Sequence, residues 1–144
     1  MITNSVECFE SIGHWMYNTP IPTDTFGFIY KITNNHDGRM YIGKKQIQKK
    51  IKMPPLKGKK NKRIKICESD WKTYTGSCNI LNEHIEQHGK DSFTFKILQL
   101  CESKWELSYE EAKLQFQADV LVNESYYNGI INCRIGKKHR KKLH

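Results

Sequence analysis

The stretch that decides the fold is GFIYKITNNHDGRMYIGKK, residues 27–45. Two runs rich in aromatic and β-branched residues, 26–33 and 39–43, cover most of it and are typical of β-strands. Between them stands Asp37-Gly38, a favoured pair for the two central positions of a tight hairpin turn. The sequence therefore predicts an antiparallel β-hairpin that turns at Asp37 and Gly38.

This turn also predicts which side chains share a face of the hairpin. Positions opposite each other, and alternate positions along one strand, point to the same side. With a two-residue turn the predicted pairs are Asn34 with Tyr41, Ile32 with Gly43, and Tyr30 with Lys45. Two phenols and an ammonium group then flank a bare glycine, which backbone or ligand can approach closely. The alternative is that tyrosines are simply good strand residues and that Gly43 only ends the strand.

The rest of the chain predicts a small domain with helices packed on a sheet. An irregular lead-in occupies 1–25, and a mobile basic loop follows the hairpin. The further elements expected are a short turn from Ser69 or Asp70 to Tyr74, a helix over 78–88 closed by Gly89, a strand over 93–100, and a helix over about 104–123. The order β-β-α-β-α indicates an α/β (α+β) sandwich: a three-stranded, mostly antiparallel sheet flanked by helices.

Positive charge is concentrated in two segments of this chain of 144 residues and net charge +9. Residues 44–65 hold eleven Lys or Arg and no acid, and 134–144 hold six more without an acid. The remainder is net negative, so the two segments suggest a polyanionic partner. The alternative is a lysine-rich loop and tail that only keep the protein soluble.

Cysteine usage and hydropathy indicate where the protein works. The five cysteines are scattered and form no CxxC pair, which argues against a disulfide framework and a cysteine zinc site. No long apolar run suggests a signal peptide or a membrane span. We therefore expect a protein of the reducing cytoplasm with no membrane partner.

The hairpin resembles the two-strand signature of the GIY-YIG nuclease family. The first triplet stands as Phe28-Ile29-Tyr30, with Gly27 one place earlier than usual, and the second, Tyr41-Ile42-Gly43, is intact. The later pieces WKTYTGS, FTFKIL, a glutamate-rich helix and YYN resemble the phage-encoded, free-standing branch related to homing endonucleases. The resemblance covers residues 26–132, with the basic loop 44–65 inside this domain and a basic tail at 133–144.

The resemblance implies a metal-dependent endonuclease that hydrolyses phosphodiesters of double-stranded DNA, in the host cytoplasm if the chain is phage-encoded. Tyr30 and Tyr41 match the motif tyrosines, one of which helps to activate water. A glutamate on a later helix holds one divalent ion, Mg²⁺ or Mn²⁺. The family's arginine after the second triplet is missing here, and the candidates for its charge are Lys45 and Arg63.

The metal-binding glutamate is expected to be Glu111 and not Glu110. Position 111 falls within a helical stripe formed by Leu107, Leu114, Ala118 and Leu121, where a carboxylate needs a partner. The alternative is a capping box in which Glu111 bonds the backbone at Ser108. A helix that starts instead at Ser103, with Glu106 in the box, leaves Glu111 free.

Other residues complete the hypothesis and its rivals. A tyrosine becomes a base only if a cation lowers its pKa, and Lys45 across the strand is the candidate. The expected DNA contacts are Gly43, Lys44, Lys57, Lys59, Lys60, Lys62, Tyr74, Asn128, Lys137, Lys138 and Arg140. Rival hypotheses are a non-catalytic nucleic-acid binder, a subunit that docks through its tail, and a zinc site at His84 and His88.

Overall fold

A computed structural model describes residues 6–132 and 134–138. Within these residues five strands and two α-helices follow one another, with short 3₁₀ turns at Trp71–Thr73 (η1) and Lys90–Ser92 (η2). The strands are β1 (Gly27–Asn34), β2 (Met40–Gln46), β3 (Gln48–Met53), β4 (Arg63–Glu68) and β5 (Phe93–Cys101), and the helices are α1 (Asn79–His88) and α2 (Lys104–Gln117).

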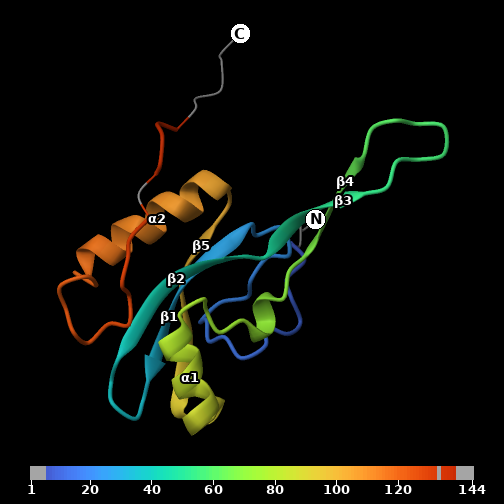
Figure 1. Cartoon of the computed structure of the whole chain (residues 1–144). Coiled ribbons are helices and arrows are strands. Elements are labelled where there is room, and N and C mark those ends of the chain that lie inside the picture. The colour runs from blue at the N-terminus through green and yellow to red at the C-terminus, as the bar shows by residue number, and fades with distance from the viewer. Residues whose placement is uncertain (1–5, 133, 139–144) are drawn as a thin grey trace, which may run out of the picture.

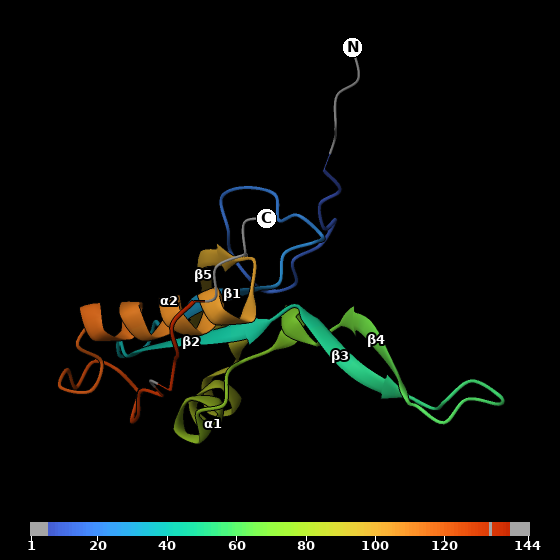
Figure 2. The ribbon, with the colours of Figure 1, turned by 90° about the horizontal axis from the view of Figure 1, so that it is seen from above.

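The central sheet has three antiparallel strands in the order β2-β1-β5. Alternate residues of β1 supply two separate cores: Phe28, Tyr30 and Ile32 pack with α1 and η1, whereas Ile29 packs with α2. The helices therefore cover opposite faces of the sheet, as the two views show (Figures 1 and 2). The predicted α+β sandwich with a three-stranded antiparallel sheet is confirmed.

The predicted two-residue turn is wrong, because five residues, 35–39, connect β1 to β2. Asn34 N–H donates to the carbonyl of Arg39, and the Asn34 side chain accepts from His36 N–H, which stabilises the wider turn. Gly38, with φ of 80°, is the turn residue in the left-handed region. The register moves by two positions, so Gly43 lies opposite Tyr30. Because two is an even number, every side chain keeps its predicted face.

The predicted mobile basic loop is also wrong over most of its length. β3 and β4 pair antiparallel from Gln48↔Glu68 to Met53↔Arg63, and only 54–62 at the far end lack regular structure. This β3–β4 ribbon projects away from the sheet (Figure 1). Its Lys and Ile residues alternate along paired strands, a pattern that the charge and the prolines of the stretch concealed.

The lead-in has no helix or regular strand over 6–25, yet it packs on the domain. Trp15 and Ile21 are buried in the core with Phe28 and Trp71. Met16 exchanges backbone hydrogen bonds with Phe95 and Ile97 of β5, at 2.7 and 3.0 Å. The lead-in thereby covers the edge of the sheet that β5 would otherwise expose.

Helix α2 starts where the sequence allowed but ends earlier than expected. The Ser103 side chain accepts from Glu106 N–H at 3.1 Å, so the helix begins after Ser103. It ends at Gln117, and Asp119 with φ of 52° turns the chain away. Leu121, expected in the buried stripe, therefore lies outside the helix and is 50% exposed.

Candidate active site

Three tyrosines meet on the α1 face of the sheet. Tyr30 and Tyr41 lie on adjacent strands with ring centroids 6.2 Å apart, and Tyr74 packs edge-on against Tyr30 at 6.2 Å. Tyr30 is 1% exposed, whereas Tyr41 and Tyr74 are half-buried. The structure therefore brings together both motif tyrosines, and adds Tyr74 from the segment after η1.

Two glycines provide the space that the phenol rings occupy. A Cβ atom on Gly43 would lie 2.5 Å from Tyr30 Oη, and one on Gly76 would lie 3.2 Å from the same oxygen. Gly43 was predicted as a DNA contact, but the space beside its Cα is occupied by the ring of Tyr30. Gly76, with φ of 87°, was missed as a site residue because its TGS segment looked only like a helix break.

Burial is the main cause that raises the pKa of both motif tyrosines. The charges of Tyr41, Tyr74 and Glu111 raise the pKa of Tyr30 further. For Tyr41, a hydrogen bond with Ser77 opposes the rise in pKa. The expectation that Lys45 lowers the pKa of a motif tyrosine is not met, because the pKa of both Tyr30 and Tyr41 is raised. Lys45 Nζ pairs with Asp70 Oδ1 at 2.7 Å and lies 4.0 Å above the Tyr74 ring.

Glu111 lies on α2, which covers the other face of the sheet and packs on the edge strand β2. Its side chain is 13% exposed, and burial raises its pKa, while the charge and backbone N–H of Lys44 lower it. Its negative charge in turn raises the pKa of Tyr30 and of Tyr41. Ser103 caps the helix, and Ser108 Oγ instead bonds Lys44 Nζ at 3.0 Å. The capping alternative for Glu111 is therefore excluded.

A pair of buried amides holds β2 between the tyrosines and the glutamate. Asn128 Oδ1 accepts from Ile42 N–H at 3.1 Å, and its Nδ2 donates to Ile42 O at 2.8 Å. Gln115 Nε2 also donates to Ile42 O, at 2.9 Å. Asn128 was predicted as a DNA contact, but it is buried and its amide is occupied by backbone. Gln115 was missed, since a glutamine in a helix carries no signal of its own.

The predicted basic residues do not all gather at the tyrosines. Arg63 lies at the outer end of the ribbon, where its Nε donates to Pro54 O at 3.3 Å, so the structure does not bring it to the hairpin face. The four lysines predicted as phosphate contacts lie in the exposed loop beyond it: Lys57, Lys59, Lys60 and Lys62.

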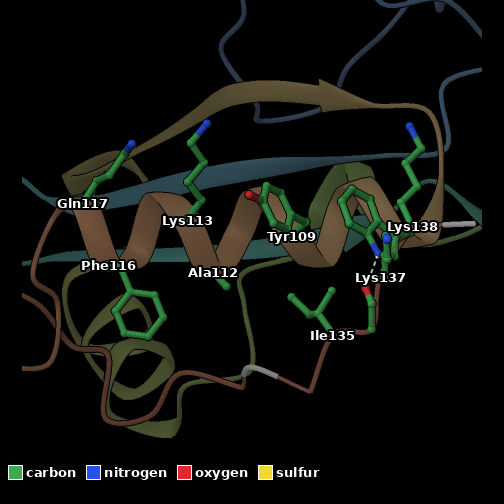
Figure 3. A pocket seen from close by; sticks show the side chains of 10 residues that line it. Tyr109, Ala112, Lys113, Phe116, Gln117, Ile135, Lys137 and Lys138 are labelled. Atoms are coloured by element: carbon green, nitrogen blue, oxygen red, sulfur yellow. Dashed lines mark hydrogen bonds between the residues drawn. The ribbon is translucent and has the colours of Figure 1, made fainter.

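Lys137 and Lys138 line a groove of about 1300 Å³ on the outer side of α2 (Figure 3). Its floor carries Trp105 and Tyr109, whose rings stack at 4.8 Å. Trp105 Nε1 donates to Gly136 O at 2.8 Å, which holds the C-terminal segment along the helix. Arg140, the last predicted contact of the tail, lies outside the described residues.

No group of three or more His, Cys, Asp or Glu side chains suited to a metal occurs in 6–132 and 134–138. The candidate zinc ligand His84 instead bonds Tyr127 Oη through Nδ1, at 2.8 Å. Glu111, as a single half-buried carboxylate, still fits a hard cation that completes its shell with water and phosphate oxygens. None of the helices in the described chain is long and apolar enough to cross a membrane.

Fold and site together define a small α+β domain whose hairpin presents paired tyrosines on the face of the sheet opposite a helical glutamate. A family profile described as "Putative endonuclease segE, GIY-YIG domain" matches residues 14–131. The chain therefore belongs to the GIY-YIG family and is a nuclease, a hydrolase of phosphodiesters. Comparison with curated proteins finds no match, and comparison with solved structures finds none.

Proposed function

We propose that the chain is a metal-dependent endonuclease that cuts double-stranded DNA at the hairpin face. The observation that carries the proposal is the position of Glu111. This carboxylate is 13% exposed, and its charge acts on the pKa of both motif tyrosines from the opposite side of β2. A buried negative charge near two phenols raises the cost of ionising all three groups. A divalent cation bound there offsets that cost.

In this proposal Glu111 holds one Mg²⁺ or Mn²⁺ ion. Such ions are commonly bound by one or two carboxylates together with water and substrate phosphate oxygens. When bound, the ion supplies positive charge that screens the scissile phosphate. Lys44, whose Nζ lies 3.8 Å from Glu111 Oε1, balances the carboxylate and can turn to the substrate because its side chain is 40% exposed.

The two motif tyrosines have different tasks in this proposal. Tyr41 is half-buried and can reach a substrate, whereas Tyr30 is almost completely enclosed. Raised pKa values keep both phenols protonated near neutral pH. Tyr41 therefore orients the attacking water as a neutral phenol. It accepts a proton from that water only after losing its own, which requires nearby positive charge to lower its pKa. Tyr30 is a positioning residue, since its ring packs against Tyr41 and fills the space above Gly43.

Lys45 is the proposed replacement for the family's arginine. It lies on the tyrosine face through its contact with Tyr74, and its partner Asp70 is itself exposed. An approaching phosphate can compete with an exposed carboxylate for this ammonium group. Arg63 has no such proximity, so we assign it to binding along the ribbon.

Supercoiled plasmid incubated with the protein, with Mg²⁺ or with EDTA, tests the proposal. We expect nicked or linear products with Mg²⁺ only, and none from Glu111→Gln with either addition. Plasmid that is bound but stays supercoiled in Mg²⁺ would contradict the proposal and indicate a non-catalytic nucleic-acid binder. Equal cutting in EDTA would remove the metal from the mechanism.

A further inference from the structure

The β3–β4 ribbon continues both walls of the candidate active site. β2, which carries Tyr41 and Gly43, runs through Ile47 into β3, and β4 returns to η1 and the segment that carries Tyr74 and Gly76. The position of the ribbon is therefore tied covalently, on both strands, to the tyrosine cluster. A ligand bound along the ribbon lies at a set distance from the tyrosines.

The base of the ribbon is held firmly in the domain. Ile47 is 1% exposed, its N–H donates to Phe26 O at 2.8 Å, and its carbonyl accepts from Ser69 N–H at 2.8 Å. The Ser69 hydroxyl also donates to Gln46 O, at 2.6 Å. These bonds clamp the two strands where they leave the core. The ribbon is an arm with a fixed root.

Charge identifies the partner of this arm as a polyanion. Residues 49–65 hold nine Lys or Arg and no acid, and within the described chain none of the nine forms an ion pair. Like charges at this density repel one another unless an anionic surface lies between them. A second copy of the chain would bring a ribbon of the same sign, so charge disfavours that occupant.

One face of the ribbon is suited to more than phosphate. Lys50 pairs with Ile66 and Lys52 with Ile64, so all four side chains point to the same side. Ile64 is 66% and Ile66 is 61% exposed, although both lie in a regular strand. Lysines that flank exposed aliphatic side chains match the major groove, where phosphates border base edges that include the thymine methyl group.

The dimensions agree with this partner. A two-stranded β-ribbon fits the width of the major groove of B-DNA. The six residues of β3 span about 20 Å, or about six base pairs at 3.4 Å each. Tyr41 lies seven residues before Gln48, so contacts made along β3 fall within about twelve base pairs of the tyrosines, on one side only.

We propose that the β3–β4 ribbon enters the major groove on one flank of the scissile phosphate, with Ile64 and Ile66 facing base edges. The ribbon is then the element that gives this nuclease sequence preference. The inference rests on the proposed function, because the flank is defined relative to the position at which the nuclease cuts. The binding itself does not depend on cleavage.

Cleavage of a randomised duplex library, followed by sequencing of the ends, tests the preference. For Ile64→Thr/Ile66→Thr we expect preference on one flank, within about twelve base pairs of the cut, to fall at least about four-fold for each isoleucine replaced. The matched control Val122→Thr/Ile130→Thr replaces two aliphatic residues that are even more exposed but lie off the ribbon. An unchanged flank in the ribbon variant, or an equal loss in the control, would overturn the proposal.

Interference footprinting on the wild-type protein needs no variant and no cleavage. In EDTA, guanine N7 methylation, which modifies the major groove, should block binding on one flank only. Binding that methylation leaves intact would refute groove entry even if the plasmid assay succeeds. Conversely, one-sided interference without plasmid cutting would refute the proposed nuclease mechanism but support binding of the ribbon in the major groove. A ribbon variant that changes the oligomeric state in size-exclusion chromatography would identify a second copy as the occupant instead.

Discussion

Removing Asn128 should destabilise the protein more than removing Gln115, although both side chains bond Ile42 O. In Asn128→Ala, Ile42 N–H loses the acceptor that it has at 3.1 Å, and Ile42 O loses a donor at 2.8 Å. A buried donor left without a partner costs about 1–3 kcal/mol, and the second missing bond adds about 1 kcal/mol. We therefore expect the free energy of unfolding to fall by about 2–4 kcal/mol.

Gln115→Ala leaves Ile42 O with its bond from Asn128, so no backbone group on Ile42 is orphaned. The expected loss is about 1–2 kcal/mol, made up of one hydrogen bond and a partly filled space. Urea denaturation of the wild type and both variants measures the difference. A Gln115→Ala variant that is less stable than Asn128→Ala would refute the reasoning that Ile42 N–H depends on Asn128.

Three further results are expected. Tyr41→Phe should cut plasmid at a strongly reduced rate with an unchanged fold, whereas Tyr30→Phe, which keeps the packed ring and loses only an enclosed hydroxyl, should lose less; a wild-type rate in Tyr41→Phe would show that its phenol oxygen is not used. Glu111→Gln should lose cleavage while Glu110→Gln keeps it. Because burial raises the pKa of Glu111, its ionised form costs stability as pH rises through that pKa, so Glu111→Gln at pH 7 should melt no lower than wild type; a clearly lower melting temperature would point to a structural role. The third result concerns the loop lysines Lys57, Lys59, Lys60 and Lys62. Neutralising them should reduce the slope of log binding constant against log salt concentration by about one for each lysine that pairs with a phosphate. An unchanged slope would show that none of the four binds DNA.

Local patterns were enough to predict much of the site. Alternation along β1 and β2 put Tyr30, Tyr41 and Gly43 on one face, and this survived a wrong turn because the register error was even. Helical spacing predicted that Glu111 points toward the domain, and its side chain is 13% exposed. Both results depend on the fixed side-chain periods of strand and helix. These periods can be read from a short segment without knowing what packs against it.

The sequence did not predict the β3–β4 ribbon, because its two strands pair with each other but do not pack on a hydrophobic core. Its lysines and prolines made the segment look like a solvated loop, although Lys and Ile alternate along it, because most of these side chains are exposed and none of them marks a buried face. Gln48 and Glu68 are twenty residues apart in the sequence. They pair because the hydrogen bond from Ser69 N–H to Ile47 O brings the two strands together at their base.

By itself the sequence determined the tyrosine face, the glutamate of α2 and the cationic character of 44–65, because these depend on residue type and local period. The tertiary structure alone decided the partners across long separations. It gave Lys45 to Asp70, Asn128 to Ile42, and Gly76 to the ring of Tyr30. Such contacts depend on how the elements pack against one another. Packing joins residues that are far apart in the sequence, so a local sequence pattern cannot predict these contacts.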